Sequence, residues 1–150
     1  MASPRGIAQR YADQVRLRLI GRRYLTEPQE RELYLEALDM GLSFEEAREV
    51  LVVTVAKSGA ARETTLDHDI ETTIAAIAGD RGWLSRTAFD RAARLYQERS
   101  GGAVGAAEAK SRVKAIMLRR SWIIRGASVF GTPHWFRIIT AADVTSAASP

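Results

Sequence analysis

The chain contains no cysteine, which excludes a disulfide framework, a thiolate metal site and a cysteine nucleophile. Histidine is nearly as scarce, with only His68 and His134 among 150 residues. Apolar stretches such as VLVV and AAIA are far too short to span a membrane, and MASPRGIAQR lacks the apolar run of a secretory signal. These absences predict a cytoplasmic, non-enzymatic protein that carries no cofactor or metal and has no membrane partner.

What the chain does contain is charge, and this charge is unevenly distributed. Residues 1–25 hold six arginines and one acidic side chain, residues 26–80 hold four basic and thirteen acidic ones, and residues 81–150 hold twelve basic and four acidic ones. Such asymmetry indicates either a surface for a polyanion or an acidic middle segment that neutralises the basic ends within the fold.

Apolar periodicity and helix-start signals predict about six helices. Thr26 with Gln29 and Ser43 with Glu46 have the spacing of capping boxes, and Ser85 can cap a later helix. No internal repeat is apparent. The predicted helices are 5–24, 26–41, 43–59, 64–79, 85–99 and 106–121.

The C-terminal region is predicted to form strands. Apolar residues alternate in WIIR (122–125) and HWFRII (134–139), which predicts an antiparallel hairpin over the apolar face of helix 106–121. The fold class is therefore mainly α, a helical bundle with a small C-terminal antiparallel β-hairpin. Residues 141–150 are small and polar and are predicted to be a disordered tail.

Asp67, His68 and Glu71 lie close together on a predicted helix, but their spacing matches no standard metal motif. An acidic helix start, favourable for the helix dipole, explains them better.

Helix 106–121 carries cations on both flanks of its apolar face. Lys110, Arg112, Lys114 and Arg119 would flank the face formed by Val113, Ile116 and Met117. Lysine and arginine neutralise phosphates, and arginine also reads guanine edges. The alternative is a solvated basic helix that packs against an acidic neighbour, such as 26–49.

The segments KSRVKAIMLRRSWIIR and IETTIAAIAGDRGWLSRTAFDRAARLY together resemble the winged-helix superfamily over about residues 68–139. The resemblance implies a recognition helix whose Lys110, Arg112, Lys114 and Arg119 face nucleic acid. It also implies that Arg125 and Arg137 are contacts of a two-stranded wing. The connection SGGAVGAAE is longer than the turn between the two motif helices of that family.

These features predict a non-enzymatic, regulatory protein that binds nucleic acid, DNA in preference to RNA. The alternative is a helical protein-interaction adaptor that docks an acidic partner through its basic C-terminal region. The apolar run VLVVTV (50–55) predicts either a homodimer contact or a central core helix. The predicted divisions are a basic N-terminal helix (1–25), an acidic helical pair (26–60), a winged-helix-like module (61–140) and the tail.

Overall fold

Side-chain caps determine where several helices begin, as the sequence predicts. Thr26 and Ser43 each accept a hydrogen bond from the backbone three residues on, and the side chains of Gln29 and Glu46 bond back to the cap. Ser85 caps its helix through its hydroxyl oxygen. Each cap satisfies backbone N–H groups that the first helical turn leaves without partners.

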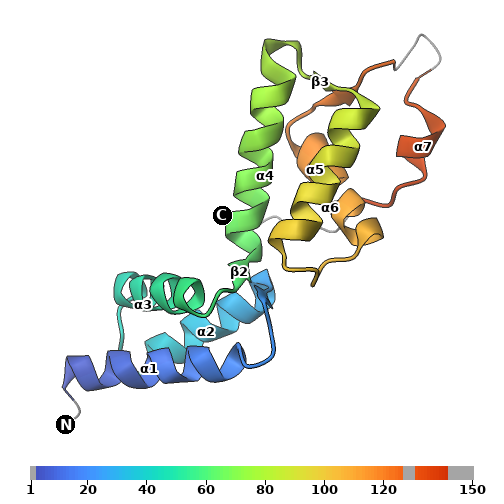
Figure 1. Ribbon diagram of the computed structural model, residues 1–150. Helices are drawn as coiled ribbons and strands as arrows, with labels where there is room; N and C mark the ends of the chain where they lie inside the picture. Colours follow the sequence, from blue (N-terminus) through green and yellow to red (C-terminus); the bar gives the residue numbers. More distant parts are fainter. Residues whose placement is uncertain (1–2, 127–130, 142–150) are drawn as a thin grey trace. The chain divides into compact units, whose positions relative to one another are not determined.

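The computed structural model describes residues 3–126 and 131–141, and it is mainly helical, which confirms the mainly-α part of the predicted fold class (Figure 1). The chain forms two units, unit 1 (residues 1–65) and unit 2 (residues 66–150). The predicted segments 1–25 and 26–60 both fall within unit 1. The predicted tail, apart from Ala141, lies outside the described residues.

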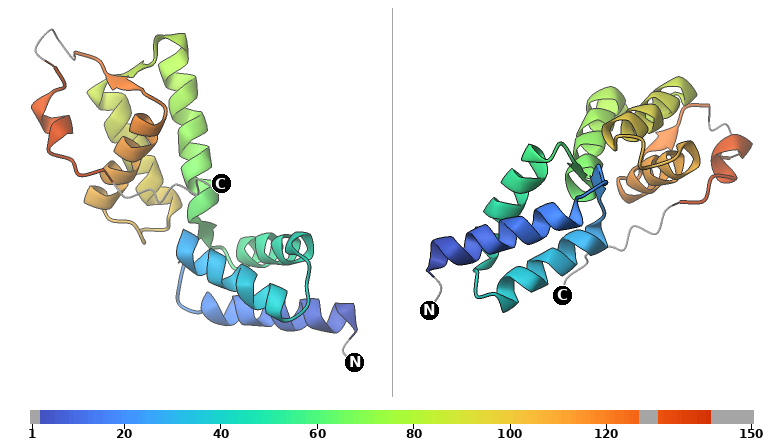
Figure 2. Two further views of the ribbon diagram at one scale, coloured as in Figure 1. Left: turned by 180° about the vertical axis from the view of Figure 1, so that it is seen from behind. Right: turned by 60° about the horizontal axis from the view of Figure 1, so that its bottom comes forward.

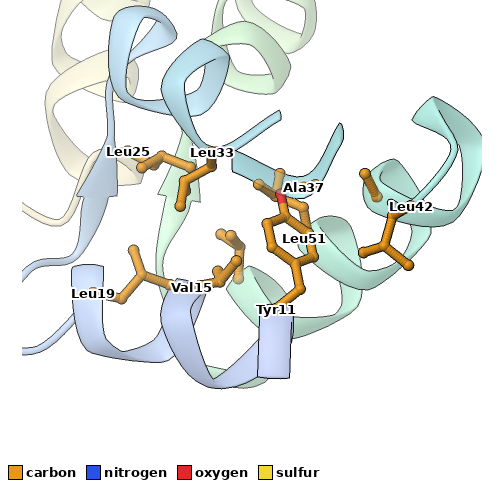
Figure 3. Packing of buried hydrophobic residues seen from close by; sticks show 10 residues of the cluster. Tyr11, Val15, Leu19, Leu25, Leu33, Ala37, Leu42 and Leu51 are labelled. Atoms are coloured by element: carbon orange, nitrogen blue, oxygen red, sulfur yellow. The ribbon is translucent and has the colours of Figure 1, made fainter. Parts of the chain in front are cut away.

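Unit 1 packs three helices around one apolar core. Its elements are α1 (Pro4–Arg18), β1 (Tyr24–Leu25), α2 (Glu27–Asp39), α3 (Phe44–Lys57) and β2 (Ala61–Arg62), with β1 parallel to β2. Figure 3 shows Tyr11 and Val15 of α1 together with Leu33 of α2 and Leu51 of α3, all of which are fully buried. Burial of such apolar surface is the main stabilising contribution to a fold of this size.

Unit 2 has a similar construction with an added C-terminal helix. Its elements are α4 (Glu63–Ala78, whose first turn belongs to unit 1), the 3-10 turn η1 (Gly79–Arg81), β3 (Trp83–Leu84), α5 (Arg86–Arg99), α6 (Ala106–Arg119), β4 (Ile123–Ile124) and α7 (His134–Arg137). Helices α5 and α6 lie side by side in both views of Figure 2. Ile70, Phe89, Tyr96 and Val113 are buried in the core of this unit.

The predicted antiparallel hairpin is wrong. Ile123–Ile124 pair in parallel with Trp83–Leu84, and His134–Arg137 form a turn of helix after Pro133. Trp135 and Phe136 both contact the ring of Phe89, although a strand would direct adjacent side chains to opposite faces. Alternation over four to six residues is too short to distinguish a strand from a single helical turn.

The two units share one order of elements, helix–strand–helix–helix–strand, a repeat that sequence inspection missed. Tyr24 pairs with Ala61 in unit 1, and Trp83 pairs with Ile123 in unit 2. Trp83 stands 59 positions after Tyr24, and Ile123 stands 62 positions after Ala61. The difference of three arises because α5 is one residue longer than α2 and the following loop is two residues longer.

Buried positions recur with the same shifts. Up to the loop that follows α2 in unit 1 and α5 in unit 2, buried residues of the two units are 59 positions apart. Tyr11, Val15, Leu25, Leu33 and Ala37 correspond in this way to Ile70, Ile74, Leu84, Ala92 and Tyr96, and all ten are buried. After the loop, a shift of 62 takes Leu42, Ala47, Leu51 and Val55 to Val104, Ala109, Val113 and Met117, again all buried. The repeat therefore lies in the burial pattern and in the strand register.

Candidate nucleic-acid interface

Two predicted contact residues of α6, Arg112 and Arg119, form ion pairs inside unit 2. The Arg112 side chain is 17% exposed, and its Nη1 lies 3.9 Å from Oδ2 of Asp67. Arg119 Nη2 lies 2.6 Å from Oε2 of Glu71, a carboxylate that Arg120 also contacts. The acidic neighbour of the basic helix is thus α4, whereas the sequence suggested residues 26–49.

Asp67 and Glu71, in the acidic first half of α4, supply the carboxylates of these ion pairs. Asp67 also accepts a hydrogen bond from the hydroxyl of Tyr96, which fixes its carboxylate next to Arg112. Within the described residues, no group of three or more histidine, aspartate or glutamate side chains is arranged to hold a metal ion.

Lys114 holds the C-terminal helix. Its Nζ donates hydrogen bonds to the carbonyl oxygens of Phe136 and Ile139, each at 2.7 Å, and lies 4.7 Å from the centroid of the Phe136 ring. Partial burial lowers the pKa of the Lys114 ammonium. A cation at the end of a helix satisfies carbonyl groups that would otherwise lack partners. The Lys114 ammonium is therefore occupied by its hydrogen bonds at the C-terminal end of α7.

The other predicted contact residues, Lys110, Arg125 and Arg137, are exposed. They do not lie on paired strands of a wing, because Arg125 follows β4 and Arg137 ends α7. The Arg125 guanidinium lies 4.8 Å from the centroid of the Trp83 ring.

Lys110 lines an open groove between α5 and α6, which we call the cationic groove. Its volume is about 280 Å³, and its lining residues are Arg86, Asp90, Ala93, Arg94, Gln97, Ala106 and Lys110. Arg94 and Lys110 form no ion pair with any residue in 3–126 or 131–141, and Arg86 stacks on Trp135 with 4.9 Å between guanidinium and ring centroid. Three cations thus face one carboxylate.

Sequence reasoning missed Arg86 and Arg94. The signal was available, because residues 86, 90 and 94 recur every four positions on α5, on a different face from its buried residues Phe89, Ala92 and Tyr96.

Three positions of the corresponding face of unit 1 hold large apolar residues. The shifts of 59 and 62 take Leu35, Leu38 and Phe44 to Arg94, Gln97 and Ala106 of the groove. These three side chains of unit 1 are 57%, 46% and 54% exposed. Residues 1–65 hold ten basic and ten acidic side chains, whereas residues 66–150 hold twelve basic and eight acidic ones. The net positive charge therefore belongs to unit 2.

No protein-family model matches this chain, and no curated protein or solved structure matches it either. None of the helices in the described part of the chain is both long and apolar enough to cross a membrane.

Proposed function

We propose that unit 2 is a non-enzymatic, regulatory nucleic-acid-binding module whose cationic groove contacts the phosphate backbone. The observation that carries this proposal is which basic side chains of unit 2 form ion pairs and which do not. Arg99, Arg112, Arg119 and Arg120 all pair with carboxylates, whereas Arg86, Arg94 and Lys110 converge on one groove that contains a single carboxylate, Asp90. Unpaired cations that line one groove favour a polyanionic ligand.

The spacing of the groove residues suits an extended backbone. Arg86 and Arg94 are eight residues apart on α5, which separates them by about 12 Å along the helix axis. The two guanidinium groups therefore address different phosphates of one strand, and Lys110 contributes from α6. Of the contacts predicted from the sequence, Lys110 is retained, while Arg112, Lys114 and Arg119 are replaced by Arg86 and Arg94.

The test is a salt titration of binding to labelled single-stranded and duplex DNA and RNA. The double variant Arg94→Ala, Lys110→Ala should bind every nucleic acid more weakly. Its slope of log affinity against log salt should fall by about one unit for each phosphate that the variant no longer neutralises. Equal weakening for all sequences would identify phosphate contacts, because base contacts alone carry sequence preference.

Two controls use the structure directly. Arg99→Ala with Arg119→Ala removes two cations that are already paired with Asp69 and Glu71 and should change binding little. Arg48→Ala removes the residue of unit 1 that occupies the place of Lys110 in the repeat, and it should also bind as wild type does. A decrease in affinity in these controls equal to that of the groove variant would contradict the proposed site.

The same cations suit an acidic protein, which is the alternative function for this surface. A polyglutamate competitor distinguishes the two ligands. Absence of wild-type binding to any nucleic acid near physiological salt, at tens of micromolar protein, together with groove-dependent polyglutamate binding, would favour the adaptor.

A further inference from the structure

A second hollow of unit 2 lies where η1 leads into β3. It measures about 340 Å³ and is lined by Ile77, Ala78, Gly79, Asp80, Arg81 and Trp83; we call it the indole hollow. Ile77 is 51% exposed and the Trp83 indole is half-buried. Asp80 and Arg81 are exposed, and neither forms an ion pair with a residue that the structure describes. An aromatic wall and two free charges of opposite sign thus border one open space.

Guanidinium groups surround the indoles at this end of the unit. Those of Arg81 and Arg125 lie 6.0 Å and 4.8 Å from the centroid of the Trp83 ring. Trp122 lies beside Gly82, and Arg120 lies 5.5 Å from its ring centroid. Aromatic faces combined with arginine are the groups that bind single-stranded nucleic acid, because bases stack on the rings and cations contact the backbone.

We propose that the indole hollow binds an unstacked base of single-stranded nucleic acid, with the base stacked on Trp83. This inference rests on the proposed function, because the cationic groove supplies the backbone contacts. Trp83 precedes Arg86 of that groove by three residues, a span of about 10 Å in extended chain, so one strand reaches both. Arg81 and Arg125 contact the phosphates that flank the bound base.

Asp80 explains why a base rather than a phosphate occupies the hollow. Its carboxylate repels phosphate but accepts hydrogen bonds from the amino groups of bases. In a duplex both faces of each base are covered by its neighbours, so a duplex cannot fill the hollow without unstacking. The indole hollow therefore selects single strands over duplex.

The direct test is fluorescence of a variant whose only tryptophan is Trp83, made by Trp122→Phe and Trp135→Phe. A single strand should quench Trp83 emission, and a strand of equal length without bases should not. Trp83→Ala should weaken single-strand binding about 5- to 150-fold, the range for removal of one stacked base, with duplex affinity and the salt slope unchanged. Trp83→Phe should retain most of the affinity.

A matched pair tests the arginine. Arg81→Ala should weaken single-strand binding, whereas Arg22→Ala, at the equivalent position of unit 1, should not. Two outcomes would overturn base binding in the indole hollow and leave the proposed function standing. One is equal quenching of Trp83 by strands with and without bases. The other is that Trp83→Ala binds single strands and duplex with the same affinities as wild type. Absence of binding to any nucleic acid would overturn both.

Discussion

Glu30 is a buried carboxylate that holds together side chains from three elements of unit 1. It is 4% exposed and accepts hydrogen bonds from Arg62 of β2, Thr64 of α4 and Tyr34 of α2, at 2.7, 3.0 and 3.2 Å. Burial, and the negative charge of Glu30, raise the pKa of the Tyr34 hydroxyl. A buried charge is tolerated only when its hydrogen bonds are satisfied, as they are here.

Replacement of Glu30 by alanine is expected to destabilise the protein by about 3–5 kcal/mol, because Arg62, whose side chain is only 17% exposed, then loses its partner carboxylate. Urea unfolding measures the change. The matched control is Asp13→Ala, which breaks an exposed pair with Arg16 and should cost at most about 1 kcal/mol. Equal unfolding midpoints for the two variants would contradict the role of Glu30.

Glu46 gives a pH-dependent contribution to stability. The backbone N–H and the hydroxyl of Ser43 donate hydrogen bonds to its carboxylate and lower its pKa below the ordinary value of 4.5. The carboxylate therefore stabilises the folded state above that pH, and this contribution is lost as the pH falls through the lowered folded pKa.

In Glu46→Gln the side chain still accepts a hydrogen bond at the cap but no longer titrates. Wild type should be more stable than this variant near pH 6, and the advantage should diminish as the pH falls below 4.5 and through the lowered pKa of Glu46. Thermal unfolding across this range measures it. Glu45→Gln, one residue away and without the Ser43 hydrogen bonds, should keep the pH profile of wild type; an identical change in both variants would refute the prediction.

At the scale of elements, α7 is a single helical turn that depends on contacts outside itself. So short a helix has too few internal hydrogen bonds to be stable alone. Lys114 bonds its C-terminal carbonyls, and Phe89 packs on Trp135 and Phe136.

Lys114→Met keeps the apolar stem but removes the ammonium, so α7 should be released while α6 remains. Faster amide hydrogen exchange in residues 134–139 and a weaker near-UV signal from Trp135 are expected. Lys110→Met, four residues earlier on α6, is the control and should alter neither signal. Unchanged exchange in Lys114→Met would show that the aromatic contacts suffice.

Local chemistry was predictable at this scale, and long-range pairing was not. Thr26, Ser43 and Ser85 begin helices because a cap acts within four residues of chain. The pairing of β4 with β3 joins segments about forty residues apart, and the contact of Arg112 with Asp67 joins segments at a similar separation. No local pattern specifies such partners, so the predicted hairpin was incorrect and α4 was not identified as the acidic neighbour of α6.

At the scale of the whole molecule, the repeat was hidden because equivalent core positions hold different residues. Glu30, Leu33 and Ala37 of α2 correspond to Phe89, Ala92 and Tyr96 of α5. Large and small side chains exchange places between the two cores, since a core requires a total volume rather than particular residues. Comparison of residue identities therefore fails where comparison of burial succeeds.

A homodimer remains a prediction for the whole molecule. On α3, Phe44, Val52 and Val53 are 54%, 37% and 46% exposed, while Leu51 and Val55 are buried in the core. The apolar run thus serves the core on one side and leaves apolar surface on the other. Sedimentation velocity at high micromolar concentration should detect a dimer, and Val53→Asp should abolish it. Detection of monomer alone for wild type would remove this prediction.

Equivalent surface positions of the two units differ in chemistry although the two cores have the same pattern of buried positions. Leu35, Leu38 and Phe44 in one unit and Arg94, Gln97 and Ala106 in the other occupy the same places on the same scaffold. Such positions are free to vary in chemistry because neither core depends on them. A repeated scaffold of this kind can present different surface chemistry on each half with no change to the interior of either.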